Sequence, residues 1–138
     1  MCINLVFCIM KIIRRLSIVL LFFTAVTAIY GGLCLMIDPS GTRMQLPASF
    51  INNTPFTDFY FPGMILFLAL GLMSLIVAIS VFSDWKCCRL LVGMQGVTIL
   101  GWIIVQIAML KVIFWLQFIY IAVGMWLTLA SASKRLAK

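Results

Sequence analysis

Four long runs of apolar residues, separated by short polar segments, dominate the chain. They cover residues 16–37, 61–82, 90–110 and 115–132. A helix needs about 20 apolar residues to cross a bilayer core of roughly 30 Å. Each run is close to that length, so the pattern predicts four membrane-spanning helices.

Composition supports this prediction and limits what else the chain can contain. Hydrophobic residues make up 65% of the sequence and charged residues 9%, whereas a soluble domain is about half apolar and about one quarter charged. The four helices and one loop, residues 38–60, use almost the whole chain. We therefore predict an all-α membrane protein that forms a single transmembrane domain in the lipid bilayer.

Charged residues gather at the ends of the apolar runs, and their distribution predicts the orientation. One side carries Arg43 and Lys111 against Asp38 and Asp58. The other carries a single carboxylate, Asp84, against Lys11, Arg14, Arg15, Lys86, Arg89, Lys134, Arg135 and Lys138. An excess of Lys and Arg marks the cytoplasmic side, so both termini are expected inside and the 38–60 loop outside. Orientation accounts for the net charge of +7, and no nucleic-acid partner is expected.

Small and polar residues recur along one face of each predicted helix, at about 100° per residue. Helices in lipid associate through small residues and hydrogen bonds, so these faces predict an antiparallel four-helix bundle. The faces comprise Ser17, Thr24, Ala28 and Gly31; Gly71, Ser74 and Ala78; Gln95, Thr98, Trp102 and Gln106; and Gln117, Gly124, Thr128 and Ser131.

The glutamines on these faces have two interpretations. A primary amide left unsatisfied in lipid costs on the order of a few kcal/mol. Gln95 and Gln106 would therefore bond across the bundle, to neighbouring side chains or to backbone carbonyls, and hold the helices together. Alternatively, Gln95, Thr98, Gln106 and Gln117 form a polar seam that lines a cavity or a route through the membrane.

The 38–60 loop has the residue preferences of a structured cap. Residues 38–41 fit a type I turn, with Asp first, Pro second and Gly fourth. Residues 46–51 would form one or two helical turns with Pro47 at the first position. Asp58 is expected to pair with Lys111 at the outer end of the bundle, and the alternative is that both side chains are solvated. Where the chain re-enters the bilayer, an aromatic cluster is predicted from Phe56, Phe59, Tyr60 and Phe61.

Few residue types suited to catalysis are present. The chain has no histidine, and no carboxylate lies inside an apolar run, although proton-coupled transport usually needs one. Of the five cysteines, Cys34 alone lies near the predicted outer side, and no CxxC spacing occurs. We predict no catalytic, metal or cofactor site.

The start of the chain has two open questions. Residues 1–9 precede Met10 and the basic flank Lys11, Arg14 and Arg15, which favours Met10 over Met1 as the true start. A cleaved signal peptide is the alternative to a retained first helix. The apolar run continues to Ile37, and this length favours retention.

Short motifs are spread along residues 10–132. They are Gly31-Gly32, Asp38-Pro39-Ser40-Gly41, Leu46-Pro47, Thr54-Pro55-Phe56, Pro62-Gly63 and Gly101-Trp102-Ile103-Ile104-Val105-Gln106. In these motifs the chain resembles a group of small uncharacterised bacterial four-helix membrane proteins. The resemblance implies the fold and carries no activity.

These observations favour a small polytopic protein of the bacterial inner membrane with a structural or interaction role. Its expected partner is another membrane protein or further copies of itself. The alternative is a small oligomeric transporter or channel-like protein built around the glutamine seam. An enzyme at the outer interface would have Asp38 and Asp58 as its only outer carboxylates and has least support.

Overall fold

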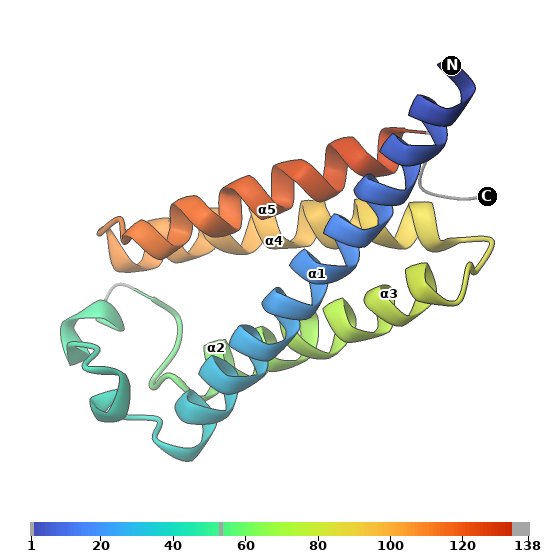
Figure 1. Ribbon diagram of the computed structural model, residues 1–138. Coiled ribbons are helices and arrows are strands. Elements are labelled where there is room, and N and C mark those ends of the chain that lie inside the picture. Colours follow the sequence, from blue (N-terminus) through green and yellow to red (C-terminus); the bar gives the residue numbers. More distant parts are fainter. Residues whose placement is uncertain (1, 53, 134–138) are drawn as a thin grey trace.

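The computed structural model describes residues 2–52 and 54–133, and within these the chain is helical with no strand (Figure 1). The long helices are α1 (Cys2–Ile37), α4 (Cys88–Leu110) and α5 (Trp115–Ala132). A further continuous span is built from α2 (Tyr60–Ile65), a π-helical segment η3 (Leu66–Leu72) and α3 (Met73–Phe82). Four helical stretches are long and apolar enough to cross a membrane, which confirms the predicted all-helical fold with four candidate membrane spans.

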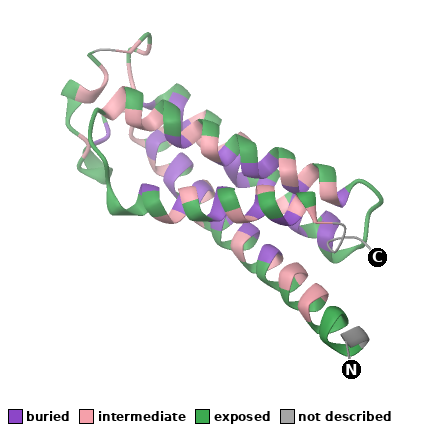
Figure 2. Ribbon diagram, turned by 90° about the horizontal axis from the view of Figure 1, so that it is seen from above, coloured by how far each residue is buried: buried purple, intermediate pink, exposed green. Residues whose placement is uncertain are grey.

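The first helix begins well before its predicted start at residue 16. Lys11, Arg14 and Arg15 end the apolar run, but lysine and arginine are good helix formers, so the helix continues through them to Cys2. Figure 2 shows these N-terminal turns projecting beyond the other helices, and residues 4–8 are exposed. The other three helical stretches lie within two residues of the predicted runs.

The helices associate as two pairs that share a core. α1 packs along the α2–η3–α3 span, and α4 packs along α5. The pairs meet where α3 contacts α4 and where α1 contacts α5. Fully buried side chains come from all four stretches and include Leu21, Leu70, Val77, Ile99 and Leu127.

Glycines allow the closest approaches within each pair. A Cβ atom added at Gly32 would lie 2.8 Å from the carbonyl oxygen of Gly63. One added at Gly71 would lie 2.7 Å from Cγ1 of Ile29. Real Cβ atoms do not approach other atoms this closely, so glycine is required at both positions for the helices to pack at this distance.

Most of the predicted small-residue faces point inward. Every predicted face residue of the first two membrane-spanning stretches is buried: Ser17, Thr24, Ala28, Gly31, Gly71, Ser74 and Ala78. Thr98 departs from the prediction, because it is exposed and its hydroxyl donates to the carbonyl of Met94 on its own helix. At 100° per residue Thr98 lies about 60° away from Gln95, which is enough to turn it off the buried face.

The π-helical segment was not predicted from the sequence. It covers Leu66–Leu72 in the middle of a helix that is otherwise α-helical on both sides. A π-turn shifts the backbone hydrogen bonds from i+4 to i+5 and often occurs at functional sites. Here the carbonyl of Ala69, inside the segment, accepts a hydrogen bond from Gln95 on α4 at 3.1 Å.

The loop between α1 and α2 is folded back on itself. Gly41 N donates to Asp38 O at 3.0 Å and closes the predicted turn, with Gly41 in the left-handed region at φ 74°. The ring of Phe59, which is only 4% exposed, lies against Gly41. A side chain at Gly41 would be strained and would meet this ring, so glycine is required there.

Short 3₁₀ turns and aromatic contacts complete the loop. The turns are Thr42–Met44 and Ala48–Phe50, and Pro47 comes just before the second turn and not inside it as predicted. The Phe61 ring stacks on Phe56 at a centroid distance of 6.4 Å and meets Tyr60 edge-on at 6.0 Å. Three members of the predicted aromatic cluster therefore meet at the start of α2, whereas the ring of Phe59 lies against Gly41.

Candidate functional site

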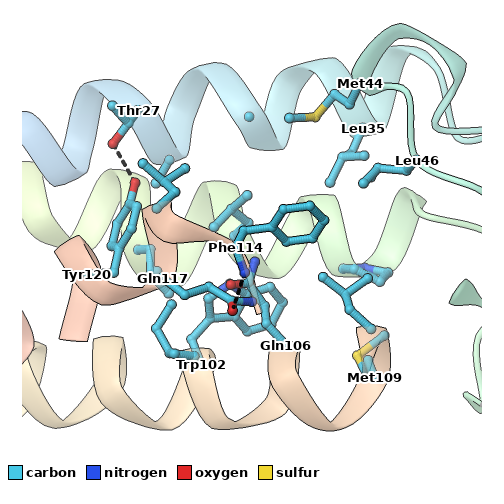
Figure 3. Close-up of a pocket in the computed structure, with 18 of the residues that line it drawn as sticks. Thr27, Leu35, Met44, Leu46, Trp102, Gln106, Met109, Phe114, Gln117 and Tyr120 are labelled. Carbon is cyan, nitrogen blue, oxygen red and sulfur yellow. Dashed lines mark hydrogen bonds between the residues drawn. The ribbon is translucent and has the colours of Figure 1, made fainter. Parts of the chain in front are cut away.

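A cavity of about 440 Å³ lies between the two helix pairs, at the end of the bundle next to the 38–59 loop. Figure 3 shows side chains from α1, the loop, α4 and α5 converging on it. Its walls come from the second half of α1, the loop, the start of the α2–η3 span, the end of α4, the α4–α5 connection and the beginning of α5. The lining residues are Thr27, Ala28, Gly31, Leu35, Met44, Leu46, Phe59, Pro62, Leu66, Leu70, Trp102, Ile103, Gln106, Met109, Leu110, Phe114, Trp115, Leu116, Gln117 and Tyr120.

The lining is mostly apolar and contains no charged side chain. Its hydrogen-bonding side chains are Thr27, Trp102, Gln106, Gln117 and Tyr120. Small-molecule sites have this character, with apolar walls, a few polar groups and volumes of about 300–1,000 Å³. A charged ligand would find no counter-charge here, and burying an unpaired charge is strongly unfavourable.

A hydrogen bond between two helices marks the end of the cavity farthest from the loop. The hydroxyls of Thr27 on α1 and Tyr120 on α5 are 2.5 Å apart (Figure 3). Because Thr27 donates to the carbonyl of Phe23 at 2.7 Å, the single proton on its hydroxyl is used and Tyr120 is the donor of the pair. The bond joins the two helix pairs at this level.

Gln117 has a structural role at the start of α5. Its Oε1 accepts a hydrogen bond from the backbone N–H of Phe114 at 3.1 Å. This is the glutamine half of a capping box, in which a Gln three residues into a helix satisfies the N-cap N–H. The amide that was predicted to line a seam therefore also fixes where α5 begins.

Two hydrogen-bonding groups on successive turns of α4 are not used by the protein. The indole Nε1 of Trp102 is buried and is the one buried side-chain nitrogen or oxygen without a partner in residues 2–52 and 54–133. Within the same residues, the side-chain amide of Gln106 makes no hydrogen bond, and it lines the cavity (Figure 3). A buried donor without a partner costs about 1–3 kcal/mol, so Trp102 stands out in an otherwise satisfied interior.

Gln95 lies outside the cavity and is fully engaged in helix packing. Its Nε2 donates to Ser74 Oγ at 2.8 Å and to the carbonyl of Ala69 at 3.1 Å. The four residues of the predicted seam are thus divided among three places. Gln106 and Gln117 lie at the cavity, Gln95 lies between α4 and the α2–η3–α3 span, and Thr98 faces outward.

The predicted outer charge pair does not form within the described residues. Asp58 instead accepts a hydrogen bond from the backbone N–H of Tyr60 at 3.0 Å, just before α2. Lys111 ends α4 in a left-handed conformation at φ 51°, with its side chain exposed. Each residue has a local role at a helix end, Asp58 as a hydrogen-bond acceptor before α2 and Lys111 as the C-cap of α4. Their side chains form no ion pair.

An ion pair is found at the opposite end of the bundle. Arg14 Nη1 lies 2.8 Å from Asp84 Oδ1, and Arg14 Nη2 donates to the carbonyl of Phe82 at 2.9 Å. These contacts tie α1 to the turn between α3 and α4. Three predicted charges of this side, Lys134, Arg135 and Lys138, lie outside the described residues.

Asp38 is held ionised by the loop. Hydrogen bonds from Ser40 Oγ, from the Arg43 backbone N–H and from Thr42 Oγ1 lower the pKa of Asp38 from 3.8 to about 2. All three bonds favour the carboxylate over the acid. Asp38 is therefore a poor proton donor at neutral pH, and its geometry is that of a turn-forming residue.

Cysteine and acidic side chains are few in the described part of the chain. No cluster of three His, Cys, Asp or Glu side chains occurs there. Cys8, Cys34, Cys87 and Cys88 are free thiols.

No family model matches the chain, and comparisons with curated proteins and with solved structures find no significant match.

Proposed function

We propose that the chain is a multi-pass protein of the bacterial inner membrane, folded as an antiparallel four-helix bundle. Both termini lie in the cytoplasm and the 38–59 loop forms a structured outer cap. The charge distribution supports this orientation, because Arg14, Lys86 and Arg89 lie at the end of the bundle away from the loop. Lys and Arg in short loops are retained on the cytoplasmic side.

Its role in this proposal is structural or interaction-based, without catalysis. The observation that carries it is the engagement of Gln95 with Ser74 and with the Ala69 carbonyl. An amide bonded to a neighbouring helix stabilises the packing and is not available to a solute. The hydrogen bond that Gln117 accepts from the Phe114 N–H likewise stabilises the start of α5 and occupies the amide oxygen.

The partner in this role is another membrane protein or a second copy of the chain. Isolation of the tagged protein in mild detergent, with mass spectrometry and light scattering, tests it. We expect a stoichiometric complex that is lost when the cap is disrupted by Phe59→Ser, since Phe59 anchors the loop against Gly41. A monomer that carries no partner would contradict an interaction role.

A transporter or channel-like oligomer is the second candidate, and the free amide of Gln106 in the cavity favours it. The two roles differ in what glutamine substitutions do. Transport requires that Gln106→Leu changes solute uptake while thermal stability in detergent is kept. A packing role requires that Gln95→Leu lowers stability and that Gln106→Leu leaves cellular uptake as it was.

A further inference from the structure

We propose that the cavity at the loop end of the bundle is a binding site for an uncharged, lipid-soluble molecule that presents a carbonyl oxygen on a flat ring. This site goes beyond the structural role proposed above and does not depend on it. The proposal rests on the cavity's volume, on its uncharged aromatic lining, and on the two unused hydrogen-bonding groups of α4.

The size and polarity of the cavity limit the class of ligand that it can hold. Its volume of about 440 Å³ lies within the range of small-molecule sites. Most of its lining residues lie on helices that are candidate membrane spans, so a lipid-soluble ligand can reach it from the bilayer. With no charged side chain in the lining, the bound part of the ligand has to be uncharged.

The aromatic lining of the cavity indicates the shape of the ligand. Five aromatic side chains line the cavity and come from the loop, from α4, from the α4–α5 connection and from α5: Phe59, Trp102, Phe114, Trp115 and Tyr120. Aromatic groups pack best in offset-stacked or edge-to-face arrangements at ring distances of about 4.5–7 Å. A planar ring is the ligand shape that several such faces accommodate together.

The unused hydrogen-bonding groups of α4 indicate the polar group of the ligand. The Gln106 amide lines the cavity without a hydrogen bond, and the Trp102 indole N–H, one turn earlier on the same helix, has no acceptor. Both can donate, so together they suit an oxygen acceptor. Protein atoms cover Trp102 Nε1 in this structure, so a hydrogen bond to the ligand carbonyl requires the indole ring to turn toward the cavity.

The unoccupied space around Gly31 provides a way to block the site. A Cβ atom added at Gly31 would have one contact with a neighbouring element within 4 Å, Leu66 Cδ2 at 3.4 Å. This is an ordinary van der Waals distance. A Cβ atom at Gly31 therefore fits without displacing a backbone, and because Gly31 lines the cavity, we expect a larger side chain there to extend into it.

The experiment measures how three probes shift the thermal unfolding midpoint of the detergent-purified protein. The probes are a medium-chain alkyl-benzoquinone, the corresponding alkylbenzene, which lacks carbonyl oxygens, and a medium-chain diacylglycerol, which has carbonyls but no ring. A ligand that binds the folded state raises the midpoint in proportion to its affinity and concentration. We expect the quinone to raise it and the other two probes to have much smaller effects.

Three variants assign the effect to the cavity. Trp102→Phe and Gln106→Leu each remove one hydrogen-bonding group, and we expect each to weaken quinone binding about tenfold. Gly31→Leu fills the cavity, and we expect it to abolish the shift without lowering the midpoint of the ligand-free protein. Trp126→Phe is the matched control, because the Trp126 N–H already donates to Ser17 Oγ at 3.3 Å and Trp126 does not line the cavity.

The outcomes separate clearly. A quinone shift that Trp126→Phe keeps and Gly31→Leu loses supports the site. Equal shifts from the alkylbenzene would overturn recognition of a carbonyl, and a shift from the diacylglycerol alone would overturn the planar ring. The proposal as a whole is wrong if no probe shifts the wild-type midpoint, or if Gly31→Leu shifts as the wild type does.

Discussion

The backbones of Gly96 on α4 and Gly124 on α5 are in direct contact. A Cβ atom added at Gly96 would lie 2.9 Å from the carbonyl oxygen of Gly124, and one added at Gly124 would lie 3.1 Å from the carbonyl oxygen of Gly96. In lipid, helices gain little from burying apolar side chains and rely on close backbone approach. This reciprocal contact explains why α4 and α5 pack so extensively along each other.

Gly96→Ala should therefore destabilise the bundle. The new methyl group would lie 2.6 Å from Thr128 Oγ1 and 2.8 Å from the Thr128 backbone nitrogen, so the two helices must separate. Overpacking of this kind costs about 1–3 kcal/mol. Gly101→Ala is the matched control on the same helix, since nothing lies within 4 Å of its Cβ position. Helix propensity should make that variant neutral or stabilising by up to about 1 kcal/mol.

The thiol of Cys88, which is 1% exposed, can report this unfolding. With Cys88 as the sole cysteine, its reaction with a fluorogenic maleimide during heating gives the midpoint. The background replaces the other cysteines by serine: Cys2, Cys8, Cys34 and Cys87. Equal midpoints for the Gly96 and Gly101 variants would show that the glycine contact does not hold α4 against α5.

Gln95→Leu should also lower the midpoint. It removes two hydrogen bonds and leaves the buried Ser74 hydroxyl without its donor. Interhelical bonds of this kind contribute about 0.6–2 kcal/mol in membranes. Thr98→Val should have no effect, because Thr98 is exposed and bonds only within α4. A double-mutant cycle between Gln95→Leu and Ser74→Ala measures the coupling directly, and zero coupling would contradict the bond.

The sequence predicted the helices well because membrane spans depend mainly on the length and hydropathy of each run. The 115–132 run coincides with α5. The start of α1 could not be predicted from hydropathy, because charge stops an apolar run without stopping a helix. The π-helical segment Leu66–Leu72 was not predicted either. Its Ala69 carbonyl accepts a hydrogen bond from Gln95, a tertiary contact that no local pattern contains.

The candidate site was predicted only in part. The pattern singled out Gln106 and Gln117, which line the cavity, because polar groups in an apolar run are conspicuous. A cavity was one of two interpretations of the glutamines, but its position and its mostly apolar walls were not predicted, since both depend on how the two helix pairs pack. Gly32, Gly63 and Gly96 were also missed as packing residues. Their importance comes from partners on other helices, and spacing along one helix does not reveal a partner.

The Asp38 turn gives a prediction about pH. The pKa of Asp38 is lowered to about 2 by its hydrogen bonds to Ser40, Arg43 and Thr42. For a lowered carboxyl pKa, the stabilising contribution is fully present above the unfolded value of 3.8 and is lost as the pH falls through about 2. The cap should thus keep its structure through neutral and mildly acidic conditions.

The backbone amide of Arg43 reports this titration, because it donates to Asp38 Oδ2 at 2.9 Å. Its proton chemical shift should move with a midpoint near pH 2, and Asp38→Asn should abolish the transition. Asp58→Asn is the control, because Asp58 bonds to Tyr60 instead. A midpoint near 3.8 would mean that the carboxylate is not held by the turn in solution.

Membrane orientation is the last prediction, and two exposed positions at opposite ends of the bundle test it. Gln45 lies in the 38–59 loop, and Cys87 lies in the turn between α3 and α4. The proposed orientation places Gln45 outside and Cys87 in the cytoplasm, because Arg14, Lys86 and Arg89 lie near that turn. In intact spheroplasts, a membrane-impermeant maleimide should label a protein with Gln45→Cys as its sole cysteine. It should label one with Cys87 alone only after the membrane is permeabilised. The reverse result would place the loop in the cytoplasm and refute the proposed topology, while the cavity and the helix packing would be unaffected.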